Sequence, residues 1–202
     1  MPGALVAVAL APALAHAALP PLRDPEPAPL TRAPEQLRRP VELVPRFGLS
    51  EPLCSRGDTT GPCALGSLAG GELAALYRPT AYFAFGGAAF YGRGLGSAQG
   101  VTGDMLGLAL VGRVYLTEAG TLDPYLEALA GVSAERVTGE RTGSTTLTAA
   151  TGSYGRAGGG LDWFATATLK LGVFAGYSEL LPAGRGTVTA GFGASLLFGE
   201  GL

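Results

Sequence analysis

The chain has 202 residues, of which 47% are apolar and 33 are glycine, and a formal net charge of −2. This small charge, with no basic stripe, gives nucleic-acid binding no electrostatic support. Beyond the N-terminus no apolar run reaches the roughly 18 residues of a transmembrane helix, and the many glycines from Phe47 onward disfavour long helices.

Residues 1–17 are predicted to be a secretory signal peptide. The apolar run Ala4 to Ala15 is followed by the small-residue site Ala15-His16-Ala17, which places cleavage after Ala17. A retained apolar helix is the alternative, and Pro12 disfavours it. Cleavage would remove His16, the only histidine of the chain.

Residues 18–40 are predicted to be a periplasmic leader. The segment is rich in proline and mixes arginine with acidic residues, so it cannot bury a core and tends to extended polyproline conformations. Docking to a periplasmic partner is the alternative interpretation.

From residue 41 onward, apolar residues alternate with small or polar ones in segments of the length that a tilted membrane-crossing strand needs, about 9 to 11 residues. The last segment is the clearest: Val188 and every second residue to Phe198 are apolar, while the positions between Thr187 and Ser195 are Thr, Gly or Ser. The predicted strands are Val41–Leu49, Gly70–Arg78, Ala81–Tyr91, Met105–Thr117, Pro124–Val137, Tyr154–Trp163, Thr168–Ser178 and Thr187–Phe198.

The predicted connections alternate in length. Short turns are expected at Arg78–Thr80, Glu118–Asp123 and Phe164–Ala167, and longer loops at Ser50–Ala69, Gly92–Asp104, Thr138–Ser153 and Glu179–Gly186. This alternation is typical of bacterial outer-membrane barrels, which have tight periplasmic turns and long external loops. Pro45 lies inside the first strand, so that strand is expected to be bulged, shorter or wrongly assigned.

The only two cysteines, Cys54 and Cys63, lie in the first long loop. In an oxidising compartment they are predicted to form a disulfide, which would stabilise the fold by about 2.5–3 kcal/mol. Between them, Arg56-Gly57-Asp58 resembles an integrin-binding tripeptide. An ordinary polar turn is the favoured interpretation of that tripeptide.

Aromatic residues are expected to collect in girdles at the two rims of a membrane barrel. Tyr91, Tyr154 and Tyr177 lie at the strand ends that lead into long loops. The strand ends beside the short turns or at the end of the last strand carry Tyr77, Tyr82, Tyr115, Tyr125, Trp163, Phe164 and Phe198.

Charged residues indicate which face of each strand points inward, because an arginine facing lipid at the bilayer centre costs about 2–4 kcal/mol. A hairpin centred near Gly120 sets Arg113 opposite Glu127, and the next hairpin is expected to set Asp162 opposite Lys170. The third strand is apolar on both faces, so its orientation is not predicted. The predicted lumen charge network is Arg113, Glu127, Asp162, Lys170, Glu42 and Arg46, with Glu72 beside them.

The segments Leu122–Glu127, Gly158–Trp163 and Thr187–Phe198 resemble the small eight-stranded outer-membrane β-barrel proteins of the OmpA-transmembrane and OmpX type. The resemblance implies an all-β, eight-stranded antiparallel, up-and-down transmembrane barrel over residues 41–202, in the outer membrane of a Gram-negative bacterium. It also implies outer-membrane lipid, lipopolysaccharide and the outer-membrane assembly machinery as partners, with Phe198 as the aromatic end marker.

An eight-stranded barrel is only wide enough to be filled by its own side chains. The charged lumen is therefore predicted to be paired and structural, with a structural role or a surface-interaction role through the long loops. The alternatives are a narrow pore or small-ligand channel, and a secreted, soluble lipocalin-like binding protein. We expect no enzyme activity, cofactor or metal, because the mature chain would lack histidine, the commonest general base and zinc ligand.

Overall fold

The computed structural model describes residues 40–54, 66–95, 101–117, 121–141, 144–181 and 185–199. The chain divides into two units, Met1–Thr31 and Arg32–Leu202. The predicted signal peptide, and the predicted leader up to residue 39, lie outside the described residues. Within the described part of the chain, no helix is long and apolar enough to cross a membrane.

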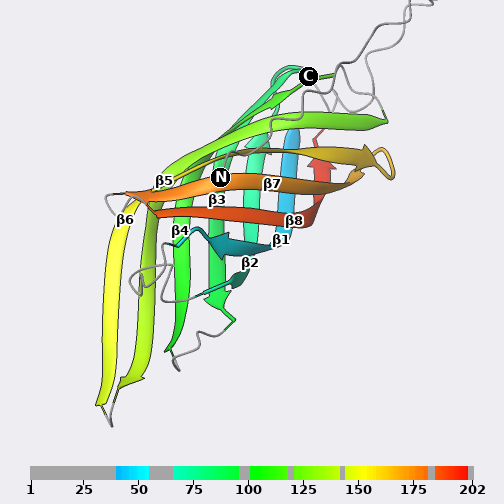
Figure 1. The fold of residues 1–202 in the computed structure, drawn as a ribbon. Helices are drawn as coiled ribbons and strands as arrows, with labels where there is room; N and C mark the ends of the chain where they lie inside the picture. The colour runs from blue at the N-terminus through cyan, green and yellow to red at the C-terminus, as the bar shows by residue number, and fades with distance from the viewer. Residues whose placement is uncertain are drawn as a thin grey trace, which may run out of the picture. The chain divides into compact units, whose positions relative to one another are not determined.

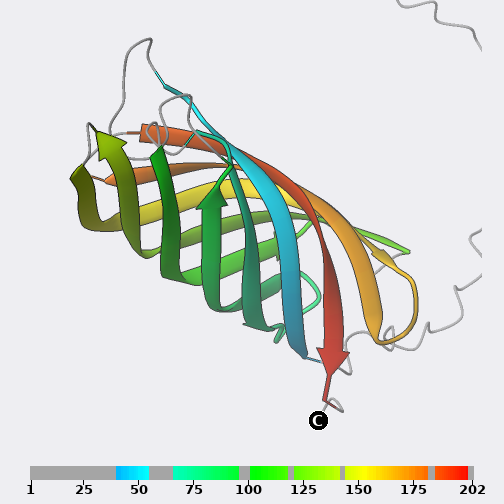
Figure 2. The same cartoon turned by 90° about the horizontal axis from the view of Figure 1, so that it is seen from below.

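Eight antiparallel strands close into a barrel in chain order (Figures 1 and 2). The strands are β1 (Val41–Pro52), β2 (Leu68–Tyr77), β3 (Phe83–Gly94), β4 (Val101–Tyr115), β5 (Leu122–Arg141), β6 (Ser144–Phe164), β7 (Leu169–Leu181) and β8 (Arg185–Phe198). Each strand pairs with its neighbours in the sequence, and β8 pairs with β1 to complete the ring. The predicted all-β, eight-stranded, up-and-down barrel is therefore confirmed.

Side chains alternate between the lumen and the outer wall along the strands, as the pleat requires. In β4, Arg113 is fully buried, whereas Leu108 and Leu110 are 63% and 76% exposed on the outer wall. β3, whose orientation the sequence does not predict, turns Ala84 and Phe90 inward. The lumen is thus filled by one side chain in two from each strand.

β1 runs straight through Pro45, although the sequence predicts a bulged, shorter or wrongly assigned strand there. Pro45 pairs with Leu73 of β2, and the register with β8 is the same on both sides of the proline. Only Val44 and Pro45 lack partners in β8. Since proline lacks one donor and keeps its carbonyl, the ladder is interrupted on one side of the strand alone.

β5 and β6 continue well past their predicted ends. The segment Thr138–Ser153, predicted as a loop, is mostly strand, because β5 runs to Arg141 and β6 begins at Ser144. β4 pairs with β5 only as far as Gly139, and β7 pairs with β6 only from Ser153, so this hairpin projects beyond the rest of the barrel (Figure 1). Threonine favours strands, so the Thr-rich composition is compatible with the ribbon.

Glycine is required where two strands approach closely. A Cβ on Gly86 of β3 would lie 1.9 Å from the carbonyl oxygen of Ala75 in β2, whereas a Cβ on Gly112 would meet nothing within 4 Å. We expect Gly86→Ala to lower the free energy of unfolding by about 1–3 kcal/mol, because the backbone must shift. The matched variant Gly112→Ala should change it by less than about 0.5 kcal/mol. Urea unfolding in liposomes measures both, and equal losses would contradict this contact.

Candidate functional site

The lumen holds a dense set of buried charges. Among the described residues, the buried basic side chains are Arg46, Arg78, Arg113, Arg156 and Lys170, and the buried acidic ones are Glu42, Glu72, Asp123, Glu127, Glu135 and Asp162. A buried charge is strongly unfavourable unless it is paired and hydrogen-bonded. The arrangement of these side chains therefore determines whether the lumen is stable.

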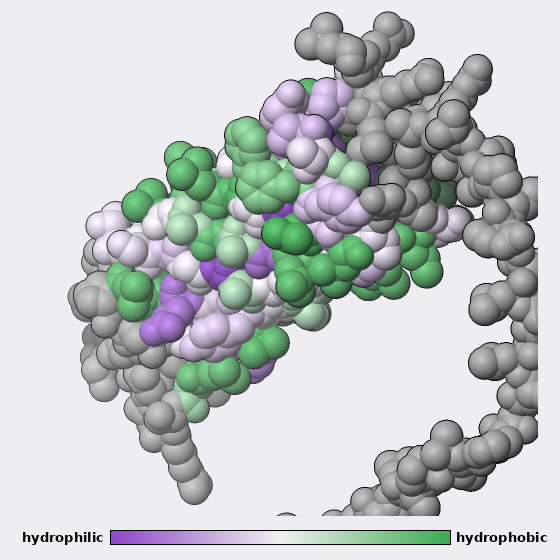
Figure 3. Space-filling model, turned by 90° about the horizontal axis from the view of Figure 1, so that it is seen from above, coloured by the Kyte–Doolittle hydropathy of each residue, from purple (hydrophilic) through white to green (hydrophobic). Residues whose placement is uncertain are grey.

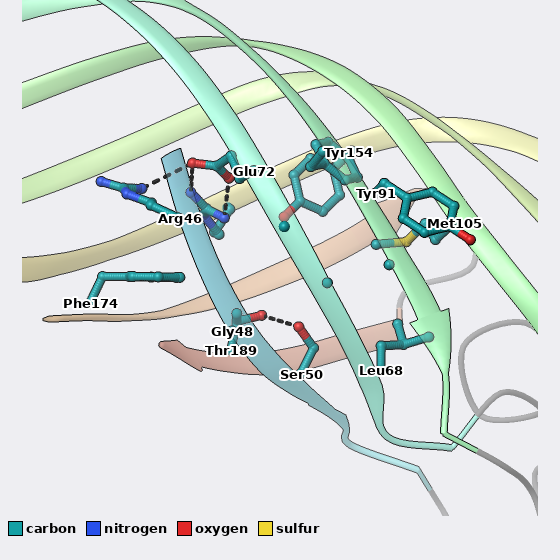
Figure 4. Close-up of a pocket in the computed structure, with 15 residues that line it drawn as sticks. Arg46, Gly48, Ser50, Leu68, Glu72, Tyr91, Met105, Tyr154, Phe174 and Thr189 are labelled. Carbon is teal, nitrogen blue, oxygen red and sulfur yellow. Dashed lines mark hydrogen bonds and ion pairs between the residues drawn. The ribbon is translucent and has the colours of Figure 1, made fainter. Parts of the chain in front are cut away.

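Four of the charges form a closed ring of ion pairs, which we call the upper quartet: Arg46 of β1, Glu72 of β2, Glu127 of β5 and Arg156 of β6. The four N–O distances round the ring are 3.0 Å for Arg46–Glu72, 2.7 Å for Glu72–Arg156, 2.9 Å for Arg156–Glu127 and 2.7 Å for Glu127–Arg46. Figure 4 shows Arg46 and Glu72 facing each other in this ring. Because cations and anions alternate, every charge has two opposite neighbours.

The upper quartet crosses the whole lumen. In the closed ring of strands, β1 lies opposite β5 and β2 lies opposite β6. The Arg46 guanidinium donates to both carboxylate oxygens of Glu127, at 2.7 and 2.8 Å, and both terminal nitrogens of Arg156 contact Glu72, at 2.7 and 3.0 Å. The Arg46–Glu127 pair is bidentate, an arrangement that is strong and geometrically specific, whereas Arg156 makes one hydrogen bond and one further ion contact to Glu72. Together the two pairs span the diameter of the lumen at this level.

A second ring, the lower quartet, lies nearer the short turns. It consists of Glu42 of β1, Arg78 just after β2, Asp123 of β5 and Lys170 of β7. Lys170 lies 3.1 Å from Glu42 and 3.3 Å from Asp123. Arg78 lies 2.8 Å from Asp123 and 3.7 Å from Glu42. This ring also alternates in charge, so the lumen contains two neutral quartets stacked along the barrel.

Arg113 of β4 connects the two quartets. Its guanidinium lies 2.8 Å from Glu127 of the upper quartet and 3.9 Å from Glu42 of the lower one. The Asp162 carboxylate also contacts Arg113, with 3.7 Å between Asp162 Oδ2 and Arg113 Nη1. Arg113 and Asp162 thus add one more cation and one more anion, and the whole set of ten side chains remains neutral.

Two tyrosines complete the hydrogen bonding of the quartets. The Tyr115 hydroxyl donates to the Glu42 carboxylate at 3.1 Å, and the Tyr125 hydroxyl accepts from Arg46 at 3.0 Å. The Arg78 guanidinium lies 3.5 Å from the centroid of the Tyr115 ring, a favourable cation–π position. The prediction that these two tyrosines belong to the rim girdle is therefore wrong. They share the inward face with Arg113 and Glu127.

A cavity of about 60 Å³ lies on the long-loop side of the upper quartet (Figure 4). Its floor is formed by the quartet residues Arg46, Glu72 and Arg156, and its wall includes Phe174 and Tyr154. Tyr154 is buried in the lumen, contrary to the rim position that the sequence predicts. The cavity has room for a few water molecules and ends at the upper quartet.

No protein-family model and no curated protein matches this chain. Solved structures share its fold. Neisserial surface protein A (NspA) matches with a TM-score of 0.56 and 13% identity, over 78% of this chain and 96% of that one. Ail, the attachment invasion locus protein of Yersinia pestis, matches with a TM-score of 0.54 and 15% identity, over 79% of this chain and 99% of that one. The outer membrane protein OprG from Pseudomonas aeruginosa matches with a TM-score of 0.51 and 14% identity, over 82% of this chain and 99% of that one.

The chain has the fold of the small outer-membrane β-barrels. In that fold, the structure places all six residues of the predicted charge network in the lumen. Arg113 stands opposite Glu127, as the predicted hairpin requires. Asp162 stands opposite Gly172 rather than opposite Lys170. The turn is closed by a bond from the Ala165 N–H to the Leu169 carbonyl, which moves the pairing by two residues and so leaves both charges on the inward face.

Sequence reasoning missed three charges of this outer-membrane-type barrel. Arg78 was placed at the junction of the predicted strand Gly70–Arg78 with a short turn, and Asp123 at the end of another short turn, yet both are buried in the lower quartet. Arg156 has the same parity as Asp162 along β6. The alternation that placed Asp162 in the lumen therefore carried a signal for Arg156 as well.

Cys54, one partner of the predicted disulfide, lies at the long-loop end of the barrel. Cys54 follows β1 and is exposed. Cys63 and the tripeptide Arg56 to Asp58 lie outside the described residues. The pairing of the two cysteines stays a prediction.

Removing the Tyr115 hydroxyl tests its place in the lower quartet. We expect Tyr115→Phe to lower the free energy of unfolding by about 1–3 kcal/mol, since the buried Glu42 carboxylate loses a donor. Tyr77→Phe is the matched control, because Tyr77 is 47% exposed on the outer wall. Urea unfolding in liposomes compares the two variants, and an equal loss in both would contradict the lumenal role of Tyr115.

Proposed function

We propose that the protein is an integral β-barrel of a bacterial outer membrane with a closed lumen, and that it has a structural or surface-interaction role. The observation that carries this proposal is the inside-out distribution of chemistry. Charges fill the lumen, while Leu110, at 76%, and Phe192, at 64%, are among the many large apolar side chains exposed on the outer wall. Figure 3 displays broad apolar areas on that wall. Such a surface favours lipid over water.

The dimensions of the apolar surface support the same conclusion. On the outer face of β4, apolar residues or glycine occupy every second position from Leu106 to Leu116. With the usual strand rise and barrel tilt, this segment spans about 25 Å, the height of the apolar band of outer-membrane barrels. Exposed aromatic residues mark the short-turn end of the band: Tyr77, Tyr82, Phe83, Trp163 and Phe198.

The quartets support a closed lumen, so the proposed role is exercised at the surface rather than through a pore. The β5–β6 hairpin and the residues of the long connections are the parts of the chain that would make such contacts. Two structural neighbours are named as a surface protein and an attachment invasion locus protein, which is consistent with this role. The proposal includes export by the predicted signal peptide in a Gram-negative bacterium and the Cys54–Cys63 disulfide.

Membrane extraction tests the proposal directly. We expect the protein to leave membranes only with detergent and to migrate differently on a gel before and after boiling, because a hydrogen-bonded closed barrel resists unfolding in detergent at room temperature. A protein soluble without detergent would contradict the membrane assignment and favour the lipocalin-like alternative.

A further inference from the structure

We propose that the β3–β5 side of the barrel binds the phosphate groups of outer-leaflet lipid through Arg93 of β3 and Arg136 of β5. The inference rests on the proposed membrane location and deepens it, since it names a lipid class and a site. Both arginines are exposed, and neither belongs to the lumen network.

The first observation is the height of these residues on the outer wall. On β3, Tyr91 is the last outward residue of the apolar band, and Arg93 is the next outward position. On β4 the corresponding polar residue is Asp104, the next outward position beyond Leu106 on the long-loop side of the band. On β5 it is Arg136. Each is the first polar side chain beyond the band on its strand, the level where lipid headgroups begin.

The second observation is the strand register. Arg93 pairs with Asp104, and Asp104 pairs with Arg136, so the three residues form one row across three adjacent strands. With neighbouring strands about 4.8 Å apart, the two arginine Cα atoms are separated by about 10 Å. Two long arginine side chains can converge on one phosphate, or on two phosphates of one headgroup, across that span.

The third observation is charge. The Tyr91 hydroxyl donates to the Asp104 carboxylate at 2.7 Å. Arg93 and Arg136 make no ion pair with another residue that the structure describes. Two arginines flank one carboxylate, so the row carries an excess positive charge, and neither guanidinium is paired with a described carboxylate. Guanidinium groups bind phosphate in a bidentate manner. On the other side of the barrel, the first outward polar residues of β1 and β7 are Glu51 and Glu179, whose negative charge disfavours phosphate there.

The test measures binding of lipid A, a bisphosphorylated outer-leaflet lipid, to the full protein in a neutral detergent by native mass spectrometry. Each of Arg93→Gln and Arg136→Gln should weaken binding about fivefold, and the double variant about 25-fold, as expected for one arginine near an anionic lipid surface. The matched control Glu51→Gln with Glu179→Gln should bind lipid A at least as tightly as the unaltered chain. Dephosphorylated lipid A should bind equally to all variants.

Two outcomes would overturn the inference. One is an unchanged affinity for lipid A in the double arginine variant. The other is displacement of lipid A by inorganic phosphate at matched concentration, which would assign the site to free phosphate. Gel migration with and without boiling, on the same preparations, separates this failure from failure of the proposed function. A heat-shifted barrel that binds lipid A regardless of Arg93 and Arg136 would refute the site alone.

Discussion

Replacing Glu127 with glutamine is expected to lower the free energy of unfolding by about 3–5 kcal/mol, the cost of breaking a buried ion pair by removing one partner. The Glu127 carboxylate lies within 2.9 Å of three guanidinium groups, those of Arg46, Arg113 and Arg156. No other carboxylate of the upper quartet serves three cations at this distance. Its neutralisation leaves three buried arginines with insufficient counter-charge. Urea unfolding of the barrel in liposomes measures the loss.

A double-mutant cycle shows whether this loss comes from the network. Arg113→Gln combined with Glu127→Gln should restore part of the stability, with a coupling energy of about 0.5–3 kcal/mol. Glu51→Gln, on an exposed residue of β1, is the control and should have little effect. Strict additivity of Arg113→Gln and Glu127→Gln would mean that the two side chains do not act as a pair.

Ion conductance is expected only when both quartets are opened. The first double variant, Glu72→Ser with Arg156→Ser, removes the β2–β6 pair of the upper quartet. The second, Arg78→Ser with Asp123→Ser, removes one side of the lower quartet. Each leaves the other ring intact and the net charge of the lumen unchanged, so both variants, like the unaltered chain, should give no current in planar bilayers. The fourfold variant should conduct, because short side chains no longer fill the narrow lumen.

Current measurements on these variants test whether each quartet alone is enough to block ion flow through the lumen. Conductance in either double variant would show that a single quartet is the barrier. A silent fourfold variant that still shows the heat-dependent gel shift would show that aromatic side chains, such as Tyr115 and Tyr125, close the lumen by themselves. A conducting unaltered chain would favour the pore over the structural role.

The architecture could be predicted because its signals are local. Alternation in Thr187–Phe198 and the positions of Arg113 and Glu127 depend only on the two-residue period of a strand, and the structure follows both. The Thr-rich continuation of β5 and β6 was missed because loop-like composition and strand-like propensity coincide there. The shifted β6–β7 pairing depends on the geometry of one turn, closed between Ala165 and Leu169, which composition does not specify.

The quartets could not be predicted because they depend on the closure of the barrel. Arg46 and Glu127 become neighbours only because β1 and β5 lie on opposite sides of a narrow ring. The tilt of the strands then decides which pairs share a level. Arg78 illustrates the remaining difficulty: it has the parity of Glu72 and its side chain does reach inward, but parity does not indicate that it meets Asp123 of β5.

The chain separations within the quartets bear on assembly. Glu42 and Lys170 are 128 residues apart, and Arg46 and Glu127 are 81 apart. β1 contributes one member to each ring, so neither ring is complete until the first strand to be synthesised meets strands from the second half of the chain. Such non-local contacts form late in folding. Until then the charges stay hydrated, so drying of the lumen and joining of β1 to β8 are expected to occur together, in one cooperative step without a stable half-built sheet.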